Sequence, residues 1–253
     1  MLTFKRSSAL VLLALLAIWL IGLPVWVGVV VIFVYIGGLV WGSIRISSQF
    51  YMPAICSGKT EGRQIAISFD DGPLPEYTAA ILDSLAVANV PACFFCIGKR
   101  VEQYPDLASR IVEQGHTIGN HSYSHHALFD LYSSARMKEE LEQTNRLIYA
   151  ATKSKPAYFR PPYGVTNPNL AKAVKKTGMT TIGWNIRSLD TVAKDEKKLL
   201  EKLWKELRPG AILLFHDTMA ITAAILPEFL QGVRARGYEI VPIDQLINED
   251  VYA

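Results

Sequence analysis

The sequence has few cysteines and gives no sign of a disulfide framework. Its 253 residues include three, Cys56, Cys93 and Cys96, which are too few for such a framework. Cys93 and Cys96 form a C-x-x-C pair, but the run Ala-Cys-Phe-Phe-Cys-Ile around them is typical of a buried strand. Because no second pair completes a metal site, the spacing favours a structural role over zinc or redox chemistry.

Acidic residues are absent from the first fifty positions, where only Lys5, Arg6 and Arg45 carry charge. Subtracting these three from the 26 basic residues leaves 23, which equals the 23 acidic residues of the rest of the chain. A formally neutral remainder provides no basic surface for nucleic acid, so we expect no nucleic-acid partner. The sequence predicts no protein partner either.

What the N-terminus does contain is an almost uninterrupted apolar run, Ala9–Trp41. This run is far longer than the ~7–15 apolar residues of a cleavable signal peptide. As one helix its 33 residues would reach about 50 Å, beyond the ~30 Å hydrocarbon core of a bilayer. Gly22-Leu23-Pro24 supplies a break, so we expect two short membrane helices, Ala9–Leu23 and Val25–Ile44, or a re-entrant hairpin.

Basic residues flank both ends of this run, which favours a hairpin with both ends in the cytoplasm. They are Lys5 and Arg6 before it and Arg45, Lys59 and Arg63 after it. A single span would instead place the rest of the chain outside the cell. The side of the membrane on which the rest of the chain lies stays open at this point.

From Gln64 onward, strand-like and helix-like stretches alternate. Seven stretches have strand character, namely 65–69, 92–97, 117–119, 158–159, 180–184, 211–215 and 238–241. Helical patterns lie between them, at 75–89, 104–115, 134–151, 167–177, 195–207 and 224–236. This alternation predicts an α/β fold with about seven parallel strands in an irregular (β/α) barrel, and an open doubly wound sheet is the alternative. We expect a membrane anchor over 1–46, a connector over 47–63 and the α/β domain over 64–253.

Polar side chains follow the predicted strands, at the point where each strand ends. They are Asp70 and Asp71, His121 and His125, Arg160, Asp190, and His216 and Asp217. The carboxyl ends of parallel strands meet at one rim of a barrel, so we expect these side chains to converge on a single cleft.

His121-Ser-Tyr-Ser-His125 is an H-x-x-x-H motif. Two imidazoles four residues apart on one face of a helical turn can reach one metal ion. Adding a carboxylate from the first strand gives the three-ligand pattern of a catalytic zinc site with room for water. Exposed or capping histidines are the alternative, and His116 and His126 are expected bystanders.

Two further side chains have both a functional and a structural interpretation. Arg160 lies in the rigid run Phe-Arg-Pro-Pro-Tyr-Gly and could form a fork with a buried carboxylate, or belong to a stiff structural loop. His216 follows an apolar run, where burial and an acidic partner could tune its pKa, or where it could be a satisfied core histidine.

Together these stretches resemble the polysaccharide deacetylase domain, also called the NodB-homology domain or carbohydrate esterase family 4. The resemblance covers about Gln64 to Ile247 in the family's motif order. The matching stretches are Ser68-Phe-Asp-Asp-Gly72, His121-Ser-Tyr-Ser-His125, Arg160-Pro-Pro-Tyr163, Trp184-Asn-Ile-Arg-Ser-Leu-Asp190 and Leu214-Phe-His216. The family fold is an irregular (β/α) barrel, in agreement with the alternation above.

The resemblance implies a role for each matching residue. Asp71, His121 and His125 would bind one divalent metal ion, with zinc expected. Asp70 would be the general base, held by Arg160, and His216 the general acid, partnered by Asp190. The backbone N–H of Tyr163 would bind the oxyanion, and Leu214 would line an acetyl pocket. The chain departs from the family at Arg187 and Thr191, which alter the wall of the substrate groove.

The implied activity is metal-dependent removal of N-acetyl groups from amino sugars in a glycan such as peptidoglycan or a chitin-like oligosaccharide. A lipid-linked or nucleotide-linked amino sugar is the alternative substrate if the domain is cytoplasmic. A membrane-tethered carbohydrate-binding pseudoenzyme and a hydrolase of non-sugar amides are the alternatives from other functional classes.

Overall fold

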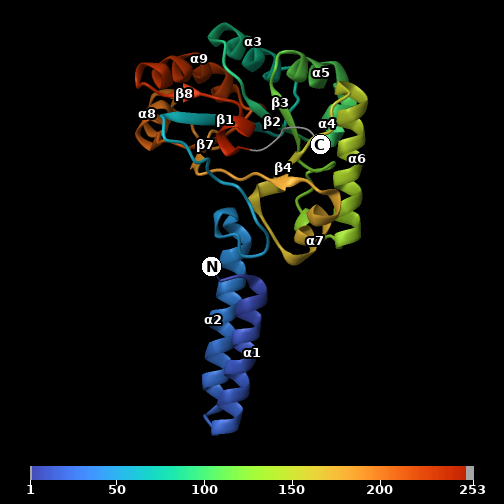
Figure 1. Cartoon of the computed structure of the whole chain (residues 1–253), viewed down its shortest axis with the longest axis vertical. Helices are drawn as coiled ribbons and strands as arrows, with labels where there is room; N and C mark the ends of the chain where they lie inside the picture. Colours follow the sequence, from blue (N-terminus) through green and yellow to red (C-terminus); the bar gives the residue numbers. More distant parts are fainter. Residues whose placement is uncertain (1, 249–253) are drawn as a thin grey trace.

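The computed structural model describes residues 2–248 and shows an apolar helical hairpin below an α/β head (Figure 1). Two antiparallel helices, α1 (Phe4–Ile21) and α2 (Val25–Ile44), form the hairpin. Gly22 ends α1 in the left-handed region, with φ of 73°, which glycine adopts without strain. The predicted break at Gly22–Pro24 is therefore confirmed. The first helix begins at Phe4, earlier than the predicted Ala9, and so includes Lys5.

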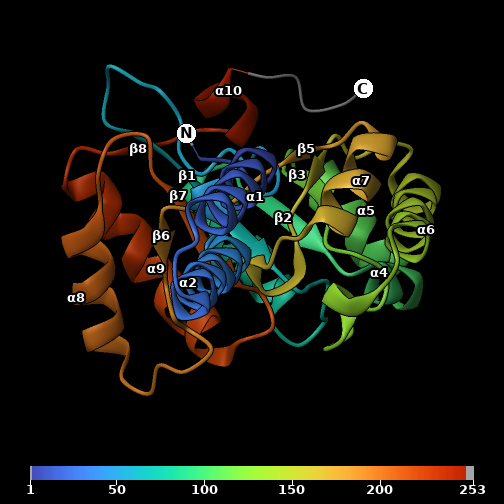
Figure 2. The same cartoon turned by 90° about the horizontal axis from the view of Figure 1, so that it is seen from below.

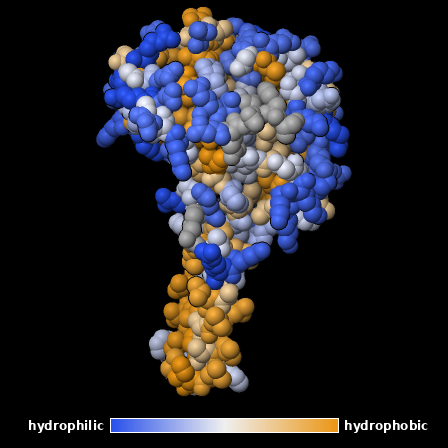
Figure 3. All heavy atoms as spheres, viewed as in Figure 1, coloured by the Kyte–Doolittle hydropathy of each residue, from blue (hydrophilic) through white to orange (hydrophobic). Residues whose placement is uncertain are grey.

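The side chains of the hairpin are apolar and face outward (Figure 3). Its helices have 18 and 20 residues, which makes them about 27 and 30 Å long, close to the ~30 Å of a bilayer core. Within residues 2–248, α1 and α2 are the two helices long and apolar enough to cross a membrane. Trp19 and Trp26 lie near the turn and Trp41 near the head, as in the aromatic belts of membrane helices. The hairpin is compatible with a membrane anchor or a signal sequence.

The head is built on a parallel sheet that curls into a half-barrel. Over the described residues its strands are β1 (Gln64–Asp70), β2 (Cys93–Cys96), β3 (Thr117–Asn120), β4 (Tyr158–Phe159), β5 (Thr180–Thr181), β6 (Ile186–Arg187), β7 (Ile212–His216) and β8 (Glu239–Ile240). The order along the sheet is β5-β4-β3-β2-β1-β7-β6, and β8 pairs with the start of β1. The predicted seven-stranded parallel fold is confirmed. The strand β6, which is two residues long, was not predicted, and the seventh predicted strand is β8, which lies off this path.

The two ends of this sheet are neighbours in sequence, since only residues 182–185 separate β5 from β6. The connector lies between these two ends of the sheet and forms a β-bridge with each side. Ile55 pairs with Ile182, and Ser57 pairs with Ala211. Phe50 is buried as well. The segment expected to be a polar connector is therefore packed against the barrel.

Helices cover the outside of the sheet (Figures 1 and 2). They are α3 (Thr78–Ala88), α4 (Gly98–Gln103), α5 (Pro105–Glu113), α6 (Ser134–Thr152), α7 (Pro168–Thr177), α8 (Glu196–Glu206) and α9 (Ala220–Ala235), with 3-10 turns η1 (Ile46–Ser48), η2 (Phe129–Leu131) and η3 (Pro162–Gly164). The short helix α10 (Ile243–Ile247) instead packs on the inner core, where Ile243 and Leu246 lie with Ala66. The ends of α7 follow from its sequence: the Asn167 side chain accepts from the Leu170 N–H, and Gly178 ends the helix at φ 74°. The short α4 and α10 were not predicted.

Alternation along the strands places the polar residues. In β1, Ile65, Ile67 and Phe69 pack outward in the core beneath the helices. The inward positions of this strand run from Ala66, which lies in the inner core, through Ser68 to Asp70. The inner row of a strand thus changes from apolar to polar toward its carboxyl end, where it reaches the rim of the half-barrel.

Candidate active site

The two aspartates that end β1 point to different places. Asp70 is the last strand residue, buried on the inner side and directly opposite His216 in the β1–β7 register. Asp71 adopts a φ of 80°, which turns the chain out of the strand. Gly72 must be a glycine because a Cβ there would lie 1.8 Å from Asp217 Oδ2.

Arg160 is completely buried and holds Asp70 in place. Its Nη1 donates to Asp70 Oδ1 at 2.7 Å and to Ser68 Oγ at 2.8 Å. Its Nε and Nη2 donate to the carbonyl oxygens of Ile182 and Gly183 at 3.2 and 2.9 Å. The guanidinium therefore joins β1 to the segment between β5 and β6. This arrangement engages one oxygen of Asp70, and Asp70 Oδ2 lies 3.8 Å from His121 Nε2.

Asp71, His121 and His125 lie together at the end of the strands. Asp71 Oδ1 is 3.5 Å from His121 Nε2 and 3.4 Å from His125 Nε2. Within residues 2–248 these three form the one group of His, Cys, Asp and Glu side chains that could hold a metal ion. The expectation that a helical turn aligns the imidazoles is wrong. The segment is an irregular loop in which Ser122 and His125 have φ values of 62° and 46°.

The donor set fits a divalent metal. Ligands at ~2.1 Å in a tetrahedral site lie about 3.4 Å apart, close to the Asp71–histidine separations. His121 Nδ1 lies 2.7 Å from the Arg160 carbonyl oxygen, so Nδ1–H donates there and leaves the lone pair of Nε2 facing Asp71. Burial lowers the pKa of His125 to about 4, which keeps that ring in the neutral, metal-binding form.

His216 and Asp190 form a second polar pair. His216 Nδ1 lies 2.7 Å from Asp190 Oδ1, and the backbone N–H of His216 and the Thr222 hydroxyl both donate to Asp190 Oδ2. Burial alone would lower the pKa of His216, but the hydrogen bond to Asp190 and the charge of that carboxylate raise it above its ordinary value. The pair therefore favours the protonated form of this imidazole.

Tyr163 and Leu214 border this cluster. Tyr163 lies in η3 with φ 57°, and its ring, 52% exposed, has its centroid 4.5 Å from that of His125. Leu214 lies on the inner row of β7, two residues before His216, and pairs with Arg187 of β6. Arg187 and Thr191 are both exposed. The backbone of Arg187 therefore lies beside Leu214, and its effect on a substrate groove stays a prediction.

The other cysteine and histidine predictions agree with the structure. Cys93 belongs to the inner core and Cys96 to the outer core, so the two thiols lie on opposite faces of β2. Burial raises the pKa of both thiols. His116 is buried against Phe94, and His126 accepts the Leu128 N–H. Neither histidine belongs to the metal-capable group found among the described residues.

Three further side chains support the site, and two of them, Asn120 and Glu140, were not predicted. Asn120 Oδ1 accepts the Ser122 N–H, and Glu140 accepts the Ser124 N–H, so both side chains hold the loop that carries the histidines. Asp217 is fully buried, its Oδ2 accepts from Thr78 Oγ1 at 2.7 Å, and burial raises its pKa to about 7. Asp217 follows His216 in the polar pair predicted after β7, so its place at the rim was expected. No sequence pattern pointed to Asn120 or Glu140.

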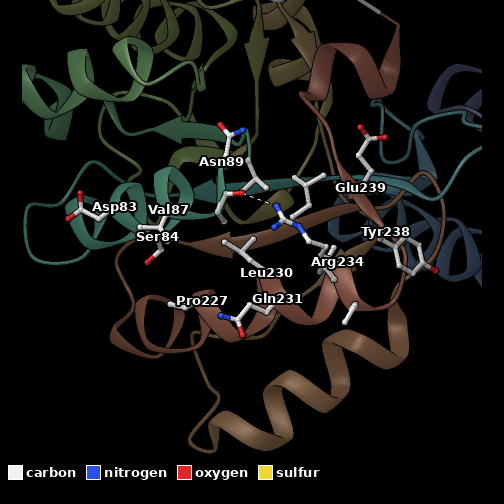
Figure 4. A pocket seen from close by; sticks show the side chains of 15 residues that line it. Asp83, Ser84, Val87, Asn89, Pro227, Leu230, Gln231, Arg234, Tyr238 and Glu239 are labelled. Atoms are coloured by element: carbon white, nitrogen blue, oxygen red, sulfur yellow. Dashed lines mark hydrogen bonds between the residues drawn. The ribbon is translucent and has the colours of Figure 1, made fainter.

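A separate groove lies between α3 and α9, as Figure 4 shows. It has a volume of about 920 Å³, and Arg234 Nη2 donates across it to the Ala88 carbonyl oxygen at 3.0 Å. None of the predicted site residues, all of which lie within the described part of the chain, lines this groove.

Comparison with known proteins identifies the family of this site. The polysaccharide deacetylase family model matches residues 57–182. The peptidoglycan-N-acetylglucosamine deacetylase of Bacillus cereus is 34% identical over 195 residues, which cover 72% of this chain and 87% of that protein. The chain belongs to the polysaccharide deacetylase family. The predicted family membership is thus confirmed.

Two further comparisons place the chain among the polysaccharide deacetylases. PgdA, a peptidoglycan-N-acetylglucosamine deacetylase of Listeria monocytogenes, is 34% identical over 204 residues, or 81% of this chain. The match spans 43% of the length of PgdA. A solved structure of a peptidoglycan N-acetylglucosamine deacetylase, Bc1960, superimposes with a TM-score of 0.75 at 25% identity, over 79% of this chain and 95% of that one. The fold of the head is therefore that of the family.

Proposed function

We propose that the chain is a metal-dependent hydrolase that removes N-acetyl groups from amino sugars in a glycan. One observation carries this proposal: a carboxylate and an imidazole, each held by its own partner, meet beside the Asp71–His121–His125 group. Asp70 is held by Arg160, and His216 by Asp190. A base and an acid on two sides of a cation site are what amide hydrolysis requires. The names of the relatives above support the glycan as substrate.

Asp71, His121 and His125 would hold the metal ion, and zinc is the ion we propose. Two imidazoles and one carboxylate with an open position form the pattern of catalytic zinc sites. A bound cation would supply positive charge that polarises the scissile carbonyl and makes water more acidic, from a pKa of 15.7 to about 7 in favourable zinc sites.

Asp70 is proposed to take the proton of the attacking water. Arg160 occupies Oδ1, so Oδ2, the oxygen closer to His121, is left to accept the proton. Asp70 is buried, and Arg160 holds its side chain in one orientation. The carboxylate therefore needs no reorientation when the proton moves. The water oxygen bonds to the carbonyl carbon and gives a tetrahedral centre.

Tyr163 and His216 are proposed to complete the reaction. The Tyr163 backbone N–H donates to the developing oxyanion, a contact worth roughly 3–4 kcal/mol. His216 gives its proton to the sugar nitrogen as the C–N bond breaks, because an amide ion is too basic to leave. The products are acetate and a free amino sugar, and Leu214 would line the pocket for the acetyl methyl group.

Acetate release tests this proposal. Purified full-length protein is incubated with N-acetylated chitooligosaccharides and, in parallel, with simple N-alkyl acetamides, with and without a chelator. We expect release from the glycan that the chelator abolishes. Equal rates on the simple amides would refute the glycan as substrate, and binding of the glycan without any release would show a carbohydrate-binding protein.

We further propose that residues 1–46 anchor the protein in a membrane and that residues 64–253 form the catalytic domain. Residues 47–63 would connect the anchor to this domain. The structure describes this domain as far as residue 248. Both ends of the hairpin lie at the head, and the Lys5 and Arg45 flanks are basic, which supports a cytoplasmic head. That topology favours a lipid-linked or nucleotide-linked amino sugar as a second candidate substrate. A reporter fused to the C-terminus, active on one side of the membrane only, decides between the two.

A further inference from the structure

A second cavity lies where the hairpin meets the head, beside α7 (Figure 1). It has a volume of about 1050 Å³ and is bounded by the start of α1, the connector and α7. Its wall is largely apolar, with Phe4, Tyr51, Met52 and Val174 among the side chains that form it. None of the proposed catalytic or metal-binding residues, all within the described part of the chain, lines this junction groove.

Three lysines border the junction groove, namely Lys5 of α1 and Lys172 and Lys175 of α7. All three are exposed, and no acidic residue lines the groove within residues 2–248. Among the described residues none of these ammonium groups makes an ion pair. Three positive charges without acidic partners beside an apolar wall suit a ligand that has both an anionic group and an apolar part.

The length of the hairpin sets the position of the junction groove relative to the membrane. If α1 and α2 fill the ~30 Å hydrocarbon core, then Phe4 and Ile44 lie at its edge. The groove begins at Phe4, so it lies in the layer that contains lipid phosphates and the first acyl carbons. Reciprocal hydrogen bonds between Ser43 and Thr166 fix the hairpin against the segment that leads into α7.

We propose that the junction groove binds one anionic phospholipid of the surrounding membrane. Its phosphate contacts Lys5, Lys172 and Lys175, while its glycerol and first acyl carbons lie on the apolar wall. This inference rests on the proposed membrane attachment, but not on the proposed chemistry.

Native mass spectrometry of the full chain in detergent tests this assignment. The protein is titrated with phosphatidylglycerol, with phosphatidylcholine, and with phosphatidylglycerol plus inorganic phosphate. The variant Lys172→Gln/Lys175→Gln removes two charges from the groove. Lys176→Gln/Lys194→Gln is the matched control, because both of its lysines are exposed and lie outside the groove.

We expect wild type and control to bind phosphatidylglycerol alike and in preference to phosphatidylcholine. The groove variant should bind phosphatidylglycerol about 30-fold more weakly, as the loss of two lysines near an anionic headgroup implies. Equal binding by the two variants, equal binding of the two lipids, or displacement by equimolar inorganic phosphate would overturn the proposal. Acetate release from a soluble chitooligosaccharide is measured in parallel. Its absence in wild type would refute the proposed function alone.

Discussion

Substitution of Asp70 by asparagine separates the proposed base from the proposed metal ligands. Asparagine has the same shape as aspartate and keeps an oxygen that can accept a hydrogen bond from Arg160. In the wild type, Arg160 Nη1 lies 2.7 Å from Asp70 Oδ1. The substitution removes the group that takes a proton from water. Since a positioned general base contributes about 10²–10⁴-fold, we expect kcat to fall by that factor. Metal content should stay unchanged, because Asp71 and both histidines are intact.

The same substitution has a cost in stability. Arg160 is completely buried and loses its one carboxylate partner, although its bonds to the Ile182 and Gly183 carbonyl oxygens remain. Breaking a buried pair typically costs about 3–5 kcal/mol, within the ~5–15 kcal/mol that a domain has. The assay therefore includes a thermal scan, and kcat is measured at least 15 °C below the observed midpoint, a margin of about four to seven kcal/mol for a domain of this size.

Asp71→Asn is the matched control, since it changes the neighbouring carboxylate in the same way. Asp71 Oδ1 contacts both histidines, so this variant should lose bound metal as well as acetate release. Two measurements, metal per chain and acetate release, are made on both proteins. Near-normal kcat in Asp70→Asn would refute the assignment of the base, and loss of metal in that variant would show that Asp70 is a ligand instead.

Three other substitutions test other parts of the site and the core. Asp190→Asn removes the charge that raises the pKa of His216, so this acid loses its proton at lower pH. The alkaline limb of the pH profile of kcat/KM should therefore move to lower pH. An unmoved limb would contradict the assignment of His216 as the acid. Arg160→Met leaves Asp70 buried without its partner and should lower the free energy of unfolding in urea by about 3–5 kcal/mol, whereas a change below ~1 kcal/mol would refute the role of this pair. His116 has no partner for either ring nitrogen within residues 2–248, and burial lowers its pKa to about 4. The unfolded chain therefore binds the proton more tightly, so stability should fall between pH 6.5 and 4, and His116→Leu should flatten that fall in denaturation series across this range.

Local patterns were sufficient to predict the fold. The strand-like stretch 65–69 and the helical stretch 167–177 agree closely with β1 and α7. The two-residue strand β6 was missed because a pair of residues has no measurable period, and its pairing with β7 is decided by tertiary contacts. The connector was expected to be polar. Instead, Ile55 forms backbone hydrogen bonds with Thr181 and Gly183, and these bonds hold the connector against the sheet.

The site was predicted in part. Strand ends located its side chains at one rim, because parallel strands carry their polar residues there. The histidine spacing suggested a helical turn, whereas the structure uses a loop with two left-handed residues, Ser122 and His125. Glu140 of α6 accepts from Ser124 in this loop, and Asn120, which accepts from Ser122, is itself fixed by Asn145 of α6. Such contacts leave no mark on the local sequence, so no period or motif could have revealed them.

Metal titration tests most directly whether Asp71, His121 and His125 hold a single cation that amide hydrolysis needs. Protein stripped with a chelator is given zinc in steps, and acetate release from a chitooligosaccharide is followed at each step. The proposed site predicts no release from stripped protein and a linear rise that ends at one ion per chain. Full activity of the stripped protein, or a rise that continues past one equivalent, would contradict it.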